Sequence, residues 1–215
     1  MRIWTMSTAD AADQESIDWY ARHCFENGAK DDRVARAWLL ETVPFHEEIG
    51  SVLPQVMAIY ESVEVQNPEE AYWPDSSEWQ HAPGEISGAR TVGRQVLMNL
   101  WVPTEPGQWW CSVRMDPRED FSRTDWQRFE NWYTYEHVGE TVIAPGINEA
   151  WRLGEELRPS GRSDFHSHFR WAMYELQDPE DMMRHVSKEP LKPIWHEFNN
   201  NETFSRTYHT VVKSL

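Results

Sequence analysis

The sequence is short of basic residues, and none of them gather into a run. It contains 20 Lys and Arg against 36 Asp and Glu, which gives a formal net charge of -16. Nucleic acids and anionic membrane surfaces repel a protein with this charge balance. We therefore expect neither a nucleic acid nor a membrane as a partner.

Long apolar runs are absent as well. The N-terminus, M-R-I-W-T-M-S-T-A-D, lacks the apolar stretch of about 7 to 15 residues that a signal peptide requires. No uninterrupted apolar run approaches the roughly 20 residues that span a bilayer. These absences predict a cytoplasmic protein.

Cysteine is rare. Only Cys24 and Cys111 occur, in apolar and aromatic surroundings and without the spacing of metal ligands. The pattern predicts two buried thiols in a reducing compartment. A Gly-rich phosphate loop, a nucleophile elbow and a Cys-His pair are also missing. We therefore expect no cofactor, no metal and no acyl-enzyme chemistry.

Tryptophan, by contrast, is abundant, with 13 residues in the chain. Large rings fill core volume efficiently, and they also form walls for flat apolar ligands. We expect most of these rings to fill the core.

The same order of elements occurs twice along the chain. Alternating apolar residues predict strands, longer periodic stretches predict helices, and a Pro followed by two acids is a typical helix start. The first expected set comprises strand 3–7, helix 9–27, strands 34–41 and 55–63, a helix from 67, and strand 91–102. The second comprises strand 110–115, helix 124–136, strands 147–153 and 169–176, a helix from 178, and strand 203–212.

Matching residues at nearly constant offsets indicate a duplication. Trp19-Tyr20 matches Trp132-Tyr133 and Ala37-Trp38 matches Ala150-Trp151, both at 113 residues (132 - 19 and 150 - 37). Tyr60-Glu61 matches Tyr174-Glu175 at 114 residues, and Arg94 matches Arg206 at 112. Two tandem repeats are therefore predicted, over residues 1–105 and 106–215.

Each predicted repeat runs β-α-β-β-α-β, which is the ferredoxin-like order. Such a sheet carries helices on one face only, so the two repeats are expected to pack sheet against sheet. The expected fold class is α+β, with both repeats in one compact body.

Two segments of the second repeat resemble a known family. They are W-Y-T-Y-E-H-V-G-E-T-V-I-A-P-G-I-N-E-A-W-R-L (132–153) and W-A-M-Y-E-L-Q-D-P-E-D (171–181), and they resemble the EthD-like branch of the dimeric α+β barrel superfamily. The resemblance implies an intrachain dimeric α+β barrel, a pseudo-dimer, and leaves a further homodimer open. The first repeat matches only in outline, because His23 follows Tyr20 by three residues whereas His137 follows Tyr133 by four. We therefore expect the working site in the second repeat.

His137 is the first candidate catalytic residue. Phe129, Tyr133 and His137 are spaced four apart, so one helical face carries two aromatic rings and an imidazole. An imidazole suits general acid or base catalysis at neutral pH, and Tyr133 could act as a phenolic donor. The alternative is a core histidine bonded to backbone groups. The pocket that His137 would border is expected to be lined by Tyr133, by Trp151 or Trp171, and by the closing strand near Tyr208.

The strand around residue 170 supplies a second candidate cluster. Period-two alternation places His168, Arg170 and Tyr174 on one face and Trp171 on the other. His168 and Arg170 are candidate anchors for an anionic or phenolic group, and a set of interface hydrogen bonds is an equal alternative. Trp195, in the loop 190–198, is a candidate for the rim of the pocket.

Three functions remain open at this point. The first is a cofactor-independent enzyme of the lyase, dehydratase, isomerase or cyclase type, with His137 moving a proton on a small hydrophobic, aromatic or polyketide-like substrate. The second is a monooxygenase or haem-binding member of the same superfamily. The third is a non-catalytic protein that binds a small molecule. The reaction class rests on analogy with the fold, whereas the site rests on the residues.

Overall fold

The computed structural model describes residues 3–9, 13–43, 56–66, 70–83, 86–98, 106–115, 122–155, 169–186, 197 and 204–215. Two candidate site residues, His168 and Trp195, lie outside these ranges. The backbone of Arg170 is described, and its side chain is not.

The elements follow the predicted order. The first half contains β1 (Ile3–Ala9), α1 (Gln14–Tyr20), the π-helical segment η1 (Ala21–Glu26), β2 (Val34–Val43), β3 (Val56–Ser62), the short 3-10 helix η3 (Ser76–His81) and β4 (Ile86–Met98). The second half contains β5 (Trp109–Met115), α2 (Arg123–Trp132), the π-helical segment η4 (Tyr133–His137), α3 (Val138–Val142), β6 (Ile147–Glu155), β7 (Phe169–Leu176), α4 (Pro179–Val186) and β8 (Phe204–Ser214).

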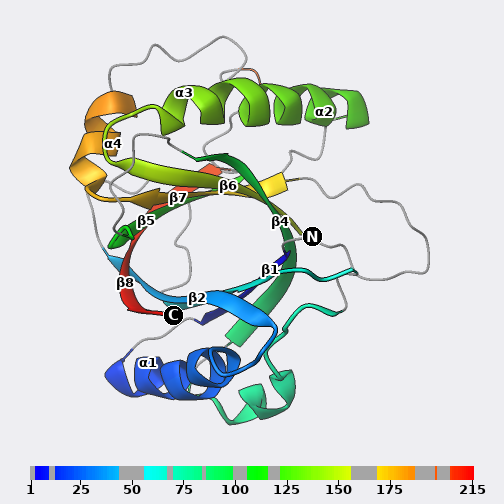
Figure 1. Cartoon of the computed structure of the whole chain (residues 1–215), viewed down its shortest axis with the longest axis vertical. Helices are drawn as coiled ribbons and strands as arrows, with labels where there is room; N and C mark the ends of the chain where they lie inside the picture. Colours follow the sequence, from blue (N-terminus) through cyan, green and yellow to red (C-terminus); the bar gives the residue numbers. More distant parts are fainter. Residues whose placement is uncertain are drawn as a thin grey trace.

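The strands form one closed antiparallel barrel in the order β1-β3-β2-β8-β5-β7-β6-β4 (Figure 1). The first half supplies β4-β1-β3-β2 and the second supplies β8-β5-β7-β6, so the strand order within each half is the same. The halves join through hydrogen-bonded pairing of β2 with β8 and of β4 with β6. The predicted α+β class is confirmed. The sequence predicted two sheets packed face to face. In the structure, the strands of the two halves are also hydrogen-bonded to each other at both edges and form one barrel.

Strand register places several matched residues at the same position in each half. Trp38 lies opposite Ile59, and Trp151 lies opposite Met173. Tyr60 and Tyr174 likewise face equivalent alanines, at 37 and 150.

One predicted match is wrong. In the closing strands, Thr91 lies opposite Trp4 and His209 lies opposite Trp110, so these two positions correspond. Arg94 lies three residues after Thr91, whereas Arg206 lies three residues before His209. Arg94 and Arg206 were matched because both are arginines, but the strand pairing does not place them at equivalent positions.

Helix boundaries differ from the sequence expectation in two places. The second-half helix runs on through η4 and α3 to Val142 and ends before the Pro145-Gly146 turn, where Gly146 has a φ of 83°. That conformation favours glycine. In the first half, the helix start predicted at Asn67 lies outside the described residues, and the described segment 70–83 contains the short helix η3. No helix in the described ranges is long and apolar enough to cross a membrane.

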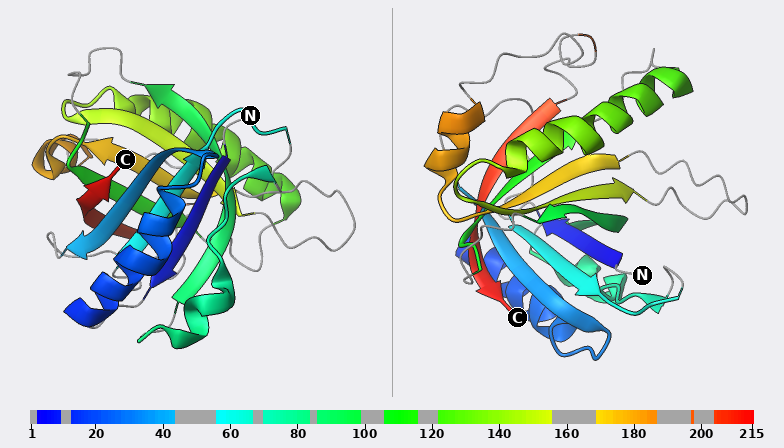
Figure 2. Two further views of the ribbon diagram at one scale, coloured as in Figure 1. Left: turned by 60° about the horizontal axis from the view of Figure 1, so that its bottom comes forward. Right: turned by 45° about the horizontal axis from the view of Figure 1, so that its top comes forward.

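Helices cover opposite sides of the barrel, with α1 on one side and α2–α3 on the other (Figures 1 and 2). Side chains therefore alternate between the interior and a helix-covered outer layer. Four of the five tryptophans in the interior cluster meet one another, with ring centroids 4.0 to 5.8 Å apart: Trp4, Trp38, Trp110 and Trp151; the fifth is Trp171. Aliphatic and methionine side chains from six strands complete this core. Core filling thus explains these four rings.

Arg36 ties the two halves together at one end of the interior. Its guanidinium donates to Glu61 of its own half and, at 3.1 Å, to Glu149 of the other half. It also lies over the rings of Trp38 and Trp151, at 4.9 and 5.5 Å from their centroids. Arg36 and Glu149 occupy equivalent register positions, opposite Glu61 and Glu175. In a dimer of identical halves, these two positions would carry the same residue and therefore the same charge. Here they carry opposite charges, which attract each other.

Exchanging these two charges tests whether the Arg36-Glu149 pair stabilises the contact between the two halves. Arg36→Glu or Glu149→Arg should each lower the free energy of unfolding by about 2 kcal/mol, less than a fully buried pair would lose because Arg36 is partly exposed. The double exchange should recover at least half of the summed loss, since an arginine at 149 would face Glu175 as Arg36 faces Glu61. Urea unfolding measures all three, and strictly additive losses would contradict the pairing.

Candidate functional site

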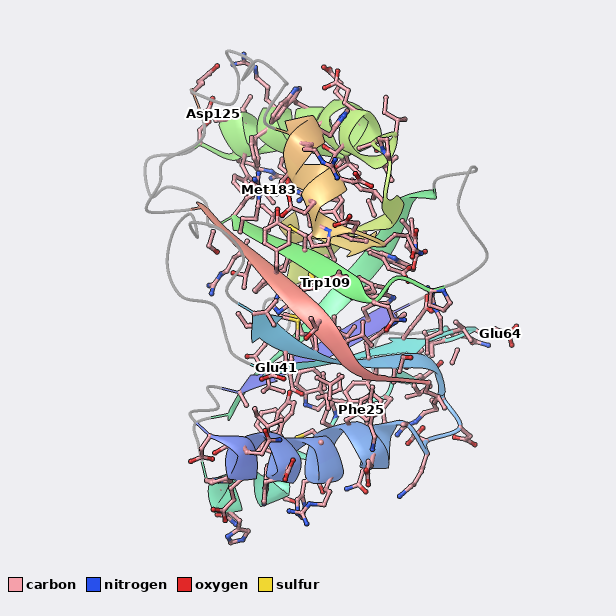
Figure 3. The ribbon with its side chains drawn as sticks, turned by 90° about the vertical axis from the view of Figure 1, so that its left-hand side faces the viewer. Phe25, Glu41, Glu64, Trp109, Asp125 and Met183 are labelled. Carbon is pink, nitrogen blue, oxygen red and sulfur yellow. The ribbon has the colours of Figure 1, made fainter. Side chains whose placement is uncertain are left out.

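The layer between helix α2–η4–α3 and the second-half strands contains the most chemically varied side chains. We call it the second-half layer and define it by Glu130, Tyr133, His137, Arg152 and Tyr174. Its apolar frame comes from Trp126, Phe129, Trp132, Val138 and Val142 on the helix and from Cys111, Val113 and Met115 on β5. Met183 on α4 (labelled in Figure 3) packs against this frame.

His137 lies at the solvent side of this layer and is half-buried. Its imidazole stacks on Trp132 at 5.2 Å between centroids and meets the edge of Tyr133 at 4.7 Å. The π-helical turn brings residues five apart into register, which allows the Trp132 contact. Insertions of this kind are frequent at functional sites. His137 thus combines aromatic support with access to solvent, as a general acid or base requires.

A buried ion pair lies beneath Tyr133. Arg152 has none of its surface exposed, and it donates to Glu130 at 2.9 Å and to the carbonyl oxygen of Trp171 at 3.3 Å. Its guanidinium also lies 4.3 Å from the centroid of the Tyr133 ring. The Tyr133 ring therefore contacts His137 and the Arg152 cation, so a negative charge formed beside it would be stabilised.

Two tyrosine hydroxyls meet in the same layer. The oxygens of Tyr133 and Tyr174 are 3.5 Å apart, and both side chains are buried. Burial raises the pKa of each phenol, and the Arg152 charge opposes that rise at both. Both hydroxyls therefore stay protonated at neutral pH and can act as hydrogen-bond donors.

The closing strand borders the layer at Tyr208. Its hydroxyl donates to the Met183 sulfur at 2.8 Å, and it lies opposite Cys111 in the β5–β8 pairing. Burial raises the pKa of Cys111 to about 12, so the thiol is protonated and is not a nucleophile at neutral pH. Both Cys24 and Cys111 are buried thiols that form no disulfide, which confirms the prediction of two buried thiols.

The first half lacks the charges of this layer. Leu39 lies opposite Ala58 as Arg152 lies opposite Ala172, and Ile17 precedes Tyr20 by the three residues that separate Glu130 from Tyr133. A Trp-His stack is nevertheless present in both halves, since Trp19 and His23 stack at 4.5 Å. The Glu130-Arg152 pair is what distinguishes the second half.

The sheet separates the predicted site residues. Tyr133, Tyr174 and Tyr208 belong to the helix-covered layer with His137, whereas Trp151 and Trp171 belong to the barrel interior. The predicted pocket that combines His137 with either tryptophan is therefore wrong, because both rings point away from the helix. The predicted alternation of Trp171 and Tyr174 on opposite faces is confirmed.

Sequence reasoning missed Glu130 and Arg152. Both carried a usable signal, because Glu130 lies one helical turn before Tyr133 and Arg152 alternates with the inward Trp151. Charged residues at two apolar-facing positions were the sign of a buried pair. Their counterparts, Ile17 and Leu39, would have made the contrast visible.

The barrel interior contains a separate polar chain. His209 is fully buried, with its Nε2 2.7 Å from Ser112 Oγ and its Nδ1 3.2 Å from Thr42 Oγ1. Burial lowers the pKa of His209 to about 3, so the ring is neutral and a weak base. This chain links β2 of the first half to β5 of the second across β8, and it is better suited to structure than to catalysis.

No protein-family model matches the sequence, and neither does any curated protein. Solved structures do match, over almost the whole chain. An anthrone oxidase-like protein superposes with a TM-score of 0.60 and 7% identity, covering 100% of this chain and 92% of its own. A protein from Fusobacterium nucleatum, provisionally named a monooxygenase, gives 0.57 and 9%, covering 99% and 93%.

A third structure, of a protein provisionally named a chlorite dismutase, superposes with a TM-score of 0.56 and 13% identity, covering 99% of this chain and 96% of its own. All three have the dimeric α+β barrel fold. This chain has that fold too. At such low identities the likeness concerns the fold alone.

Proposed function

We propose that this chain is a cofactor-independent enzyme that moves a proton on a small, apolar, aromatic or polyketide-like substrate, in a lyase, dehydratase, isomerase or cyclase reaction. The observation that carries the proposal is the contact series in the second-half layer, from half-exposed His137 through Tyr133 to the buried Arg152-Glu130 pair. Buried charges are costly and are often kept for a task. The first half, with Ile17 and Leu39, does without them.

Each group has a distinct role in the proposed reaction. His137 takes a proton from the substrate at the solvent side of the layer. The positive charge of Arg152, which lies over the Tyr133 ring, stabilises the enolate or phenolate that forms beside His137, and the neighbouring Tyr174 hydroxyl keeps Tyr133 in place. Glu130 is a positioning residue, because it holds the Arg152 guanidinium over the Tyr133 ring. Tyr208 borders the substrate from the closing strand.

The candidates His168, Arg170 and Trp195 are proposed as further substrate contacts, on the sequence argument alone. Trp151 and Trp171 are not part of this proposal, since they fill the interior. We also infer that residues 1–105 and 106–215 are tandem ferredoxin-like repeats, and that the second belongs to the EthD-like branch. The shared strand order and register support the repeats. The sequence segments 132–153 and 171–181 support the branch.

Oxygen chemistry is the second candidate, favoured by the names of two structural neighbours, a monooxygenase and an anthrone oxidase-like protein. It begins with the same proton transfer. The resulting carbanion would react with molecular oxygen, gaining one oxygen atom and losing two hydrogens overall, with water as the second product.

Haem does not fit the described side chains. A macrocycle beside His137 would need the space between helix and sheet that fully buried Tyr133, Tyr174 and Arg152 occupy. This layer therefore has no room for haem, and an absorption spectrum of the purified protein checks this.

A substrate screen tests the proposal. Phenols, β-dicarbonyl compounds and anthrone are incubated with the protein in air and under argon, with product masses and oxygen uptake recorded. An unchanged mass indicates isomerisation or cyclisation, loss of water indicates dehydration, and a gained oxygen with oxygen uptake indicates the monooxygenase reaction. His137→Gln should lower the rate of whichever reaction is found by at least about tenfold. Turnover that is unaffected by this substitution would refute the assignment.

A further inference from the structure

His137 ends the π-helical segment η4, in which one helical turn holds an extra residue. The Val138 N–H bonds to the carbonyl oxygen of Tyr133, five residues earlier, where an α-helix would bond residues four apart. The extra residue places His137 over Trp132, also five residues earlier, and the two rings stack with 5.2 Å between their centroids. With regular α-helical spacing, one of these rings would be turned by about 100° around the helix axis, which would break the stack. The π-helical turn therefore sets the direction of the His137 imidazole.

A side-chain hydrogen bond holds the backbone of His137 at the end of this turn. Thr141 Oγ1 donates to the carbonyl oxygen of His137 at 2.8 Å, and Thr141 is 2% exposed, so water does not readily replace this bond. The part of α3 that carries Thr141 is also held from outside, because Nε2 of His185 on α4 lies 3.3 Å from the carbonyl oxygen of Glu140. Thr141 therefore ties His137 to an anchored part of α3.

The first half has a similar bond in a solvent-exposed form. Asn27 Nδ2 donates at 3.1 Å to the carbonyl oxygen of His23, which lies in the π-helical segment η1, and both side chains are exposed. As with Thr141, the donor lies four residues after the histidine. Water competes for an exposed hydrogen bond and weakens its contribution. A buried hydroxyl in this place thus distinguishes the half that carries the candidate catalytic histidine.

We propose that Thr141 is a positioning residue, whose hydroxyl fixes the π-helical turn and thereby keeps the His137 imidazole stacked on Trp132. A π-helical turn bonds residues five apart and an α-helical turn residues four apart, so exchanging these bonds moves the π-helical turn along the helix. Such a shift past His137 would carry its imidazole away from Trp132. The hydroxyl opposes the shift because it keeps the His137 carbonyl bonded to Thr141. The effect on turnover rests on the proposed function, whereas the effect on the stack does not.

The Thr141→Val variant removes the hydroxyl at nearly the same shape, and Thr141→Ser keeps it. NMR spectra of the histidine imidazoles report the stack, since the ring current of Trp132 shifts the His137 signals, which are assigned by their absence in His137→Gln. Thr141→Val should lose most of this shift, and Thr141→Ser should keep it. On the substrate found in the screen, Thr141→Val should lower kcat at least about tenfold with KM little changed, because a misplaced catalytic group loses rate rather than binding. Thr141→Ser should retain the wild-type rate.

Two further variants serve as controls. Thr141→Ala also lacks the hydroxyl and repeats the measurements if Thr141→Val folds poorly, and Asn27→Leu is the matched first-half variant, which should change neither the His137 signals nor turnover. Unchanged His137 signals in Thr141→Val would overturn the proposal, and so would equal losses in Thr141→Val and either Thr141→Ser or Asn27→Leu. Loss of the shift with normal turnover would support the positioning role and refute the catalytic role of His137, so the two proposals fail separately.

Discussion

The Arg152→Leu variant should lose about 3 to 5 kcal/mol of the free energy of unfolding, because Glu130 would stay buried without its partner. The Arg152 guanidinium also has no exposed surface, so water cannot replace it beside the carboxylate. The Glu130→Ile variant should lose a comparable amount, with the unpaired charge on the arginine instead. Urea unfolding at pH 7 measures both.

The double variant Glu130→Ile/Arg152→Leu separates stability from function. It installs the residues that the first half has at these positions, Ile17 and Leu39, so the layer should pack as an apolar core and recover most of the loss. Turnover should nevertheless fall at least about tenfold, because nothing then stabilises the anion. Wild-type turnover in a stable double variant would show that the ion pair is only structural.

Acid should destabilise the protein through His209. The folded ring stays neutral down to a pKa of about 3, whereas the unfolded ring takes up a proton below its ordinary value of 6.5. The unfolded chain therefore binds the extra proton between these values, and stability falls as the pH falls through that window. The slope should be about 1.4 kcal/mol per pH unit from this residue alone.

The His209→Gln variant isolates this contribution. Glutamine can bond to Ser112 and Thr42 but does not titrate, so its stability should fall less steeply with acid than that of the wild type. Urea unfolding at several pH values between 7 and 4.5 gives both curves. Parallel curves would mean that the folded His209 accepts a proton in this range and that the burial argument fails.

Much of the fold could be predicted from the sequence because the signals were local. Alternation and helical periodicity identified the strands and helices, and the repeated Trp-Tyr and Ala-Trp pairs fixed the correspondence of the halves. The Arg94–Arg206 match was wrong because the offset between the two halves is larger in the closing strands than in the earlier strands. A single shared residue type cannot reveal such a change in offset. Barrel closure depends on pairing across the halves, which no local pattern specifies.

The candidate site was predicted less completely, for a related reason. His137 and Tyr133 stood out through their spacing on one helix, whereas Arg152 and Glu130 come from different elements and are recognisable only once helix and strand meet. Trp151 and Trp171 were placed with His137 because aromatic residues suit a pocket. Strand alternation assigns them to the interior instead, and comparison with Trp38 in the first half would have shown it.

The most direct test of the central claim compares His137→Gln with His23→Gln on the substrate found in the screen. Both histidines stack on a tryptophan, and His137 also meets the ring of Tyr133, over which the Arg152 guanidinium lies. His137→Gln should lower kcat/KM at least about tenfold with a melting temperature within a few degrees of the wild type, and His23→Gln should change neither. Equal losses in the two variants, or normal turnover per folded molecule of His137→Gln, would contradict the placement of the active site in the second half.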